Sequence, residues 1–258
     1  MDIKVHIIGR SHFNEGGLSA FLRREGLSWK RSSGATGLEE LIEAAGRICY
    51  MSFGKKQSPR SNRDYIRHLV HMGHESVLEH VSWTFLVTGV SRGFTHQLVR
   101  HRVGFSFSQL SQQYHDETEA QFVEPLAIAL SDKARKVWKR AINDSKKAYD
   151  EILKSLAEVK QSVAPVDDKR ELMRALRSAA RSVLPNATET KIVMTANARA
   201  LRYFLRIRGS IPGDEEMRRV AAALLREVRP EAPSIFFDFE MGSLDDGSPI
   251  VHWTGVGK

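Results

Sequence analysis

The chain has 258 residues, 41% of them hydrophobic, and a formal net charge of +8 at neutral pH. This apolar content is enough for a sizeable core, and no apolar run approaches the roughly 18 residues that indicate a membrane-spanning helix. Residues 1–9 are typical of a short strand rather than a signal peptide. We therefore expect a cytoplasmic protein with no membrane partner, whose positive charge attracts anions.

In chain order, the spacing of apolar residues predicts helices separated by a few strands. The predicted strands cover residues 3–8, 81–90 and 191–196, with an extended piece at 235–239. The predicted helices cover residues 38–50, 61–73, 91–104, 131–156, 168–183, 197–208 and 214–228. We expect loops elsewhere, including a glycine-rich tail. Because no repeat or linker appears, the sequence predicts one α+β domain over residues 1–258, with mixed helices around a small sheet.

Nucleic acid is one class of anion that could explain the positive charge. However, the basic residues are spread along the chain, and no helix-turn-helix, zinc finger or ribonucleoprotein motif is present. The lysine-rich stretch at 133–147 also contains acids and apolar residues at helical spacing. Small anionic ligands are therefore favoured, and we expect no nucleic-acid partner.

Cys49 is the single cysteine, which excludes an intramolecular disulfide and a cysteine-based zinc site. Its neighbours are apolar at helical spacing, so we expect a buried, inert thiol and not a nucleophile. Residues 73–80 contain two histidines and two glutamates. The histidines are six positions apart and do not share a helical face, so we expect no metal there.

Residues 91–114 carry the clearest functional signal. Ser91 is placed to cap a helix that we expect to end near Gly104. The Arg-His-Arg segment at 100–102 would lie at the negative end of that helix, followed by a loop of Ser, Gln and Tyr side chains. Such cations beside neutral hydrogen-bonding groups indicate an anion-binding site, and a solvated helix end is the alternative interpretation.

With its flanks, Gln97 before and Ser-Gln-Leu-Ser-Gln-Gln-Tyr at 108–114 after, this segment resembles the signature of the flavin-dependent thymidylate synthases. Residues 73–80, 180–185, 197–199 and Arg208 extend the resemblance to roughly residues 38–235. It implies that fold, a homotetramer, and methylation of a uracil nucleotide at C5, dUMP to dTMP. FAD would be the cofactor, with NADPH and methylenetetrahydrofolate as co-substrates.

The resemblance assigns site residues position by position. Residues at flavin-contacting positions are His74, Ser76, Arg100, His101, Arg102, Gln109, Asn197, Arg199 and Tyr203. Residues at nucleotide-contacting positions are Gln97, Arg100, Gln109, Ser111, Gln112, Gln113, Arg181 and Arg208. C5 of uracil becomes nucleophilic when anionic charge on the ring is stabilised, and Arg208 is the candidate catalytic residue because an arginine stays protonated. Arg181 is suited to clamp the phosphate.

Several positions depart from the family pattern. Eight residues instead of seven separate Arg102 from Ser111, and we place the insertion at 103–105. Gln113 stands where the family has an arginine, and Tyr203 stands where it has Asn or His. Pro212 begins a Pro-Gly pair in place of the family's His-Ala. These changes leave open a UMP or dUMP methylase of a specialised nucleoside pathway, or a basic flavoprotein or nucleic-acid-binding protein without methylase activity.

Overall fold

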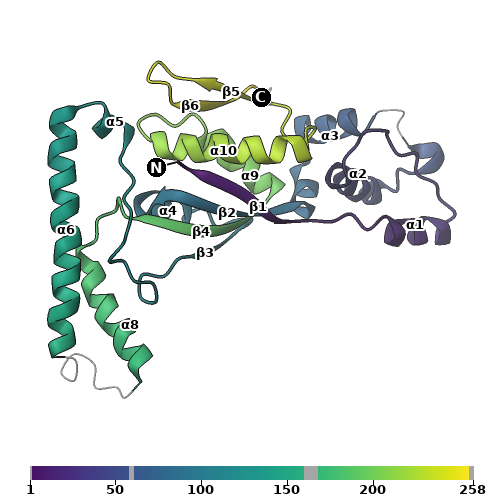
Figure 1. The fold of residues 1–258 in the computed structure, drawn as a ribbon. Coiled ribbons are helices and arrows are strands. Elements are labelled where there is room, and N and C mark those ends of the chain that lie inside the picture. The colour runs from purple at the N-terminus through teal and green to yellow at the C-terminus, as the bar shows by residue number, and fades with distance from the viewer. Residues whose placement is uncertain (1, 58–60, 160–167, 256–258) are drawn as a thin grey trace. The chain divides into compact units, whose positions relative to one another are not determined.

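The computed structural model describes residues 2–57, 61–159 and 168–255 (Figure 1). Four strands form one sheet in the order β1 (Lys4–Arg10), β2 (Ser82–Ser91), β4 (Glu189–Asn197), β3 (Phe105–Gln109). A separate two-stranded antiparallel sheet pairs β5 (Phe239–Ser243) with β6 (Pro249–Trp253). The α+β class predicted from the sequence is confirmed, with helices making up the rest of the regular structure.

The α-helices begin at side chains that suit helix N-termini. They are α1 (Glu15–Arg24), α2 (Gly37–Tyr50), α3 (Asn62–His71), α4 (Arg92–Leu98), α5 (Leu126–Ala129), α6 (Asp132–Glu158), α8 (Lys169–Ala180), α9 (Ala198–Arg208) and α10 (Glu215–Glu231). Three short 3₁₀ helices are η1 (Gly54–Lys56), η2 (Glu75–His80) and η3 (Arg181–Val183). Ser61, Ser91, Ser131, Asp168, Asn197 and Asp214 each accept a backbone hydrogen bond as N-cap, which confirms the role predicted for Ser91.

The chain divides into two compact units that interleave along the sequence. The first unit contains residues 1–4, 87–100 and 107–193, and the second contains residues 5–86, 101–106 and 194–258. We call them the α6–α8 unit and the α9–α10 unit after their main helices. The prediction of a single domain over residues 1–258 stays a prediction.

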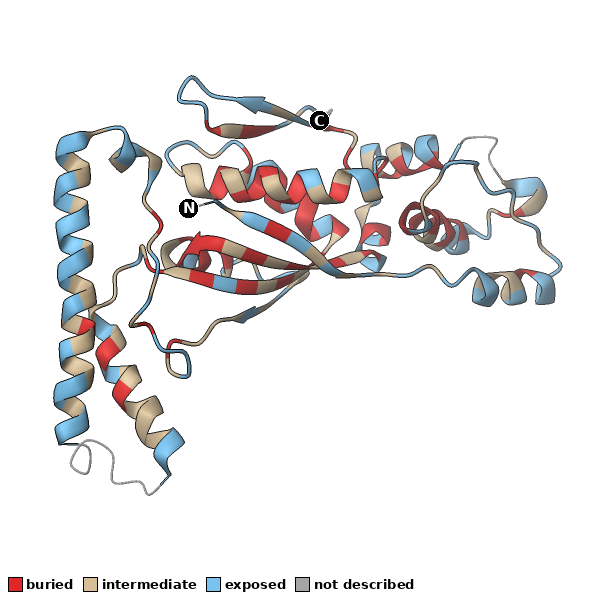
Figure 2. Cartoon of the chain, viewed as in Figure 1, coloured by how far each residue is buried: buried red, intermediate tan, exposed pale blue. Residues whose placement is uncertain are grey.

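The α9–α10 unit holds most of the largest buried side chains (Figure 2). On β2, Trp83 and Phe85 are fully buried while Ser82 and Thr84 are half-buried, which is the alternation expected of a strand with one covered face. Phe204 on α9 and Leu224 on α10 are also fully buried. In the α6–α8 unit, Tyr149 of α6 and Leu176 of α8 are buried where these two helices pack.

Two predictions around residues 91–114 were wrong. Helix α4 ends at Leu98, so the Arg-His-Arg segment follows the helix and does not lie on its last turn. The helix stops early because the chain turns at residues 99–100 and 103–104 to enter β3. Residues 105–109, expected as loop, form this strand beside β4.

The structure also differs from the prediction at Cys49 and near both ends of the chain. Cys49 is exposed, not buried, because α2 turns Ile42, Glu43 and Arg47 inward, with Glu43 and Arg47 paired at 2.6 Å. Residues 15–24 form α1 where a loop was expected. Residues 235–238 are turns, and the expected tail forms the β5–β6 hairpin. No helix in the described residues is long and apolar enough to cross a membrane.

Candidate functional site

A cavity of about 330 Å³ opens in the α9–α10 unit between η2, α9 and the β5–β6 hairpin. Three residues at predicted flavin positions, Asn197, Arg199 and Tyr203, line it together. They lie within the first two turns of α9, since Asn197 caps that helix and accepts a hydrogen bond from the Ala200 N–H at 2.8 Å. The helix start therefore brings these three side chains to one place.

Arg199 is held by two carboxylates of η2. Its Nη1 donates to Glu79 Oε1 at 2.6 Å, and its Nε lies 3.8 Å from Glu75 Oε2. All three side chains are between one third and one half exposed, so solvent screens these ion pairs. The pairs orient Arg199 at the rim of the cavity more than they stabilise the fold.

Residues 103–105, where we place the insertion, contact this helix start through Gly104. Gly104 has φ +74°, and its carbonyl accepts a hydrogen bond from the Asn197 N–H at 3.1 Å. A Cβ at Gly104 would lie 2.7 Å from both Asn197 Nδ2 and Ala200 Cβ. The turn thus needs glycine both for its left-handed backbone and for its close approach to α9.

The predicted catalytic residue, Arg208, contacts the predicted flavin residue His101. Arg208 Nε donates to His101 Nε2 at 3.2 Å. Burial lowers the pKa of His101, and the charge of Arg208 lowers it further. The imidazole is also packed edge-on against Phe204, with ring centroids 5.2 Å apart. His101 is therefore neutral at pH 7 and serves as an acceptor that orients Arg208.

The remaining predicted residues of this unit do not line the cavity. His74 and Ser76 lie exposed at the start of η2, close in sequence to the lining residue Glu75. Arg102 is exposed in the turn before β3. These side chains are available to a ligand, and in the described residues no hydrogen bond or ion pair joins them to Asn197, Arg199 or Tyr203.

In the α6–α8 unit, Gln109 at the end of β3 is fixed by two hydroxyls. Its Nε2 donates to Thr95 Oγ1 on α4 at 3.0 Å and to Thr190 Oγ1 on β4 at 3.3 Å. The Gln109 amide thus ties α4 to the sheet. Gln97 and Arg100, also predicted to bind ligand, are exposed at the end of α4.

The turn after β3 carries three predicted nucleotide residues. The Ser111 carbonyl accepts from the backbone N–H of Tyr114 and His115, which closes the turn. Gln113 Nε2 donates to Ser178 Oγ on α8 at 3.1 Å, so this amide is already engaged by a helix hydroxyl. Gln112 is 5% exposed, and its Nε2 has no hydrogen-bond partner among the described residues.

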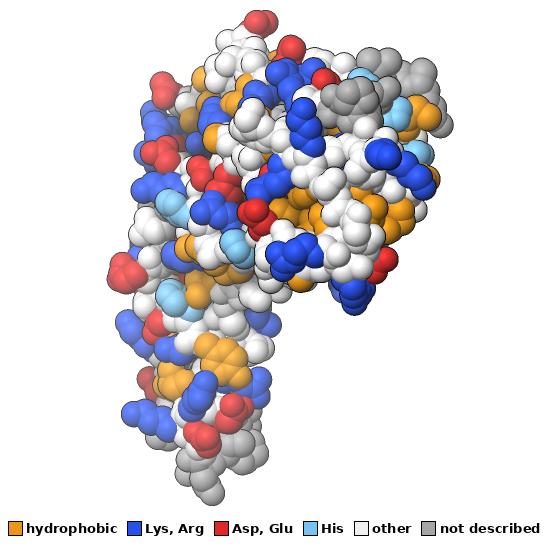
Figure 3. All heavy atoms as spheres, turned by 90° about the vertical axis from the view of Figure 1, so that its right-hand side faces the viewer, with side chains coloured by type: hydrophobic (Ala, Val, Ile, Leu, Met, Phe, Trp, Pro, Cys, Tyr) orange, Lys and Arg blue, Asp and Glu red, His pale blue; other side chains and the backbone are white. Residues whose placement is uncertain are grey.

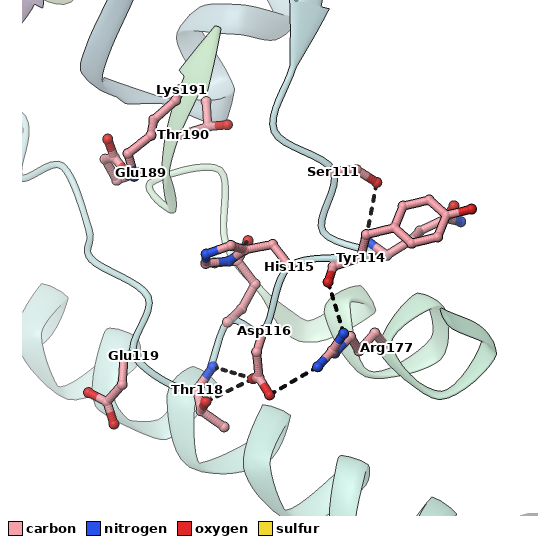
Figure 4. A network of polar contacts seen from close by, with 12 residues as sticks. Ser111, Tyr114, His115, Asp116, Thr118, Glu119, Arg177, Glu189, Thr190 and Lys191 are labelled. Carbon is pink, nitrogen blue, oxygen red and sulfur yellow. Dashed lines mark hydrogen bonds and ion pairs between the residues drawn. The ribbon is translucent and has the colours of Figure 1, made fainter. Parts of the chain in front are cut away.

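Arg177 of α8 secures the same turn from the other side. Its Nη1 donates to the Tyr114 carbonyl at 2.9 Å, and its Nη2 to Asp116 Oδ2 at 3.3 Å (Figure 4). Asp116 in turn accepts from the Thr118 N–H and hydroxyl. Burial alone would raise the pKa of Asp116, but these hydrogen bonds and the Arg177 charge outweigh burial and lower it.

Sequence reasoning missed Arg92, which lies near Arg181. Burial lowers the pKa of Arg92, and the positive charge of Arg181 lowers it further. Arg92 Nη1 is buried without a hydrogen-bond partner among the described residues. A signal was available: Arg92 is the first residue of α4, where the helix dipole disfavours a cation. Two neighbouring arginines with an unsatisfied buried donor are suited to bind an anion.

Glu117 is the acidic residue whose charge raises the pKa of Arg92. Its side chain is 3% exposed, and burial raises its pKa. The charges of His115 and Arg92 oppose that rise, and Glu117 Oε1 lies 3.8 Å from His115 Nδ1. Glu117 thus offsets part of the positive charge without closing the arginines off in an ion pair.

Comparison with known proteins identifies the family. A sequence model of the family described as "Thymidylate synthase complementing protein" matches residues 33–234. The chain is 44% identical over 232 residues to a flavin-dependent thymidylate synthase of Mycobacteroides abscessus, covering 89% of this chain and 90% of the relative. It is 46% identical over 219 residues to that of Mycobacterium sp. (strain JLS), covering 84% and 85%.

A third relative, the flavin-dependent thymidylate synthase of Corynebacterium efficiens, is 42% identical over 236 residues, covering 90% of this chain and 91% of the relative. Such identity over nearly the whole length, together with the family match, confirms the resemblance seen in the Arg-His-Arg segment. The chain belongs to the flavin-dependent thymidylate synthase family.

Proposed function

We propose that this protein is a methyltransferase that converts dUMP to dTMP with FAD as cofactor and with NADPH and methylenetetrahydrofolate as co-substrates. The observation that carries the proposal is 42–46% identity, over 84–90% of this chain, to flavin-dependent thymidylate synthases. The arginines at the predicted positions supply the charge that such substrates need.

The residues present fit a flavin dinucleotide. Around the cavity, Asn197 and Tyr203 offer neutral hydrogen-bonding groups, and Arg199 offers a cation for a pyrophosphate. A cavity of about 330 Å³ takes one ring system, so the exposed His74, Ser76 and Arg102 would hold other parts of the cofactor. When bound, the flavin supplies the hydride that reduces the methylene group on uracil.

Arg208 would polarise the uracil ring. His101 accepts from Nε of Arg208, and no ion pair or hydrogen bond with another described residue engages the terminal Nη groups. A guanidinium at the ring's N3 and neighbouring carbonyl stabilises negative charge there and makes C5 a better nucleophile. A guanidinium is too weak an acid to serve as a proton shuttle, so this side chain would act electrostatically and not as a base.

Arg181 would bind the phosphate of the nucleotide, and we add Arg92 to that role. The unpartnered Arg92 Nη1 is a buried donor that a phosphate oxygen would satisfy. The other proposed nucleotide residues are Gln97, Arg100, Gln109, Ser111, Gln112 and Gln113. Gln109 would act mainly by position, since Thr95 and Thr190 already hold its amide.

Self-association as a homotetramer and a cytoplasmic location are further proposals. Ile48, Tyr50 and Met51, at the end of α2, expose 44%, 68% and 38% of their side chains. Figure 3, which faces the side carrying α1, α2 and α3, shows apolar side chains gathered in a patch with charged side chains of both signs around it. Exposed apolar surface of this kind supports subunit contact. Light scattering of the purified protein tests it, and an active monomer would contradict the tetramer.

The decisive test of the activity uses purified protein with FAD, NADPH and methylenetetrahydrofolate, and compares dUMP with UMP as methyl acceptor. We expect FAD to remain bound after desalting and dTMP to form. If no flavin is taken up and no methylated nucleotide appears, the enzyme proposal fails. Methylation of UMP at a rate comparable to dUMP would instead support the specialised nucleotide methylase.

A further inference from the structure

The cavity in the α9–α10 unit has a wall that lies outside the segment matched by the family. The family match ends at residue 234, whereas Phe239 and Trp253, which line the cavity, belong to the β5–β6 hairpin. They are directly paired across that hairpin. The hairpin therefore completes the cavity beside the predicted flavin residues of α9.

A row of alternating aromatic and cationic groups forms this wall. The guanidinium of Arg206 lies 5.4 Å from the centroid of the Tyr203 ring and 5.0 Å from that of the Trp253 ring. These are cation–π distances. Tyr203 and Arg206 are exposed on the same side of α9, and all three side chains line the cavity.

Trp253 is fixed from behind by a buried ion pair. Its Nε1 donates to Asp238 Oδ2 at 2.8 Å, and Arg202 donates to both oxygens of Asp238 at 2.6 and 2.7 Å. Arg202 is 5% exposed and Asp238 3% exposed. The indole is thus held in one orientation, which lowers the entropic cost of packing a ligand against it.

Among the cations that line the cavity, Arg206 alone has no carboxylate partner in the described residues. Arg199 is paired with Glu75 and Glu79, and Arg202 is paired with Asp238. The N–H groups at the edge of the Arg206 guanidinium are therefore free to bind an anion, while the adjacent rings offer a flat surface. A ligand suited to this wall carries both a planar ring and a negative charge.

We propose that Tyr203, Arg206 and Trp253 form a subsite for the planar heteroaromatic ring of an anionic ligand, with the ring against the aromatic wall and the anionic group on Arg206. This assignment rests on the proposed function for its choice of ligands. FAD, NADPH and folate all combine such a ring with an anionic chain. The tyrosine that departs from the family pattern at position 203 then serves as part of the wall.

Isothermal titration of the purified protein with FAD, NADP⁺ and folic acid, in separate experiments, tests the subsite. The variants are Arg206→Gln, Trp253→Leu and Trp253→Phe. Arg226→Gln is the matched control, because Arg226 is exposed on α10 and does not line the cavity. Since Arg206 is exposed, its replacement leaves folding intact even if a Trp253 variant proves unstable.

For at least one of the three ligands, we expect Arg206→Gln and Trp253→Leu to weaken binding by about tenfold. Trp253→Phe should retain more affinity than Trp253→Leu, and Arg226→Gln should change nothing. The ligand affected identifies which ring occupies the wall. If the unaltered protein binds these ligands and every variant binds them within twofold, the subsite is wrong while the proposed function stands. If the variants lose binding but the unaltered protein makes no dTMP, the proposed function fails and the subsite stands.

Discussion

Two arginines of the α9–α10 unit, Arg202 and Arg208, are held by partners, whereas Arg92 and Arg181 of the α6–α8 unit lie close enough for their charges to interact. Arg202 is paired with Asp238, and Arg208 is oriented by His101. Arg92 and Arg181, in contrast, repel each other, and Arg92 has a buried donor without a partner. Paired arginines are fixed before any ligand arrives. The repulsion between Arg92 and Arg181 is unfavourable, and a bound anionic ligand would reduce it.

The largest effect on stability should come from breaking the buried pair in the α9–α10 unit. In Asp238→Ala, the Arg202 guanidinium loses its carboxylate while it stays buried, and the Trp253 indole loses its acceptor. We expect unfolding free energy to fall by about 3–5 kcal/mol, measured by denaturant titration. Glu79→Ala is the control, because it breaks an exposed pair and should cost less than about 1 kcal/mol. Equal losses would contradict the distinction.

The same pair predicts the direction of acid destabilisation. Burial by itself would raise the pKa of Asp238, but hydrogen bonds and charge from Arg202 outweigh it and lower the pKa. The stability contributed by the ionised carboxylate is therefore complete above the unfolded pKa of about 3.9 and is lost as pH falls through the lower folded pKa. Denaturant titrations at pH 7 and below pH 4 should show the Asp238→Ala penalty shrinking in acid.

Arg208 should matter for chemistry more than for folding. Arg208→Gln keeps a donor but removes the charge proposed to polarise uracil. We expect kcat/KM for dUMP to fall by about 10²–10³-fold, the usual loss when one transition-state stabiliser is removed. Thermal unfolding should change little, since Arg208 is only half-buried. Activity within tenfold of the unaltered enzyme would remove Arg208 from its catalytic role, and Arg226→Gln supplies the charge-matched control.

Helix starts were the part of the fold that the sequence predicted well, because a cap is a local event. Ser91 accepts from the backbone N–H of Phe94, three residues later, as its position predicts. Strand β3 was missed because its pairing with β4 joins segments about 80 residues apart, which no local pattern shows. The β5–β6 hairpin had a signal that went unused, the Asp246-Gly247 turn pair.

The candidate site likewise has some features that local sequence predicts and others that it does not. The family resemblance assigns Asn197, Arg199 and Tyr203 to one ligand, and in the structure these three residues line one cavity. The hydrogen bond between His101 and Arg208 joins residues 107 positions apart, so sequence alone could not predict it. Cys49 was misplaced for a physical reason: the Glu43–Arg47 pair is buried on α2, which turns the thiol outward.

The unpaired arginines of the α6–α8 unit should respond to phosphate. We expect dUMP or inorganic phosphate to raise the melting temperature of the unaltered protein, because an anion bound to the native state stabilises it. In Arg92→Gln this rise should shrink and dUMP affinity should fall about tenfold or more, while stability without ligand stays equal or increases. Arg140→Gln, on exposed α6 surface, is the control. An unchanged phosphate response in Arg92→Gln would contradict the anion site.

His101 should make both stability and kcat/KM depend on pH. Its pKa lies below the usual 6.5 because burial and the Arg208 charge disfavour the imidazolium. The folded state therefore resists protonation, and stability is lost as pH falls below the unfolded pKa of about 6.5. Protonated His101 cannot accept from Arg208 Nε, so kcat/KM should fall in acid. In His101→Gln, whose amide oxygen still accepts, this acid limb should flatten; an unchanged limb would assign it to another group.

The smallest predicted effect concerns Gln113. At a nucleotide contact, a neutral amide in place of the family's arginine should weaken binding. However, the Gln113 Nε2 is engaged by Ser178, and Arg92 and Arg181 belong to the same unit. Gln113→Arg would free Ser178 and add a third cation. We expect kcat/KM for dUMP to change by less than about tenfold, roughly 1.4 kcal/mol.

Measuring the same constants with UMP decides whether Gln113 affects substrate choice. If the unaltered enzyme prefers dUMP by more than about a hundredfold, or 2.7 kcal/mol, position 113 has little part in selecting the sugar. The arginines proposed to bind the phosphate do not reach the 2′ position of the sugar, so an added cation at 113 should strengthen the binding of both nucleotides alike. Comparable rates with both, shifting toward dUMP in Gln113→Arg, would mean that this residue sets specificity. In that case Arg92 and Arg181 would contribute affinity for the nucleotide. The turn held by Ser178 and Arg177 would discriminate between dUMP and UMP.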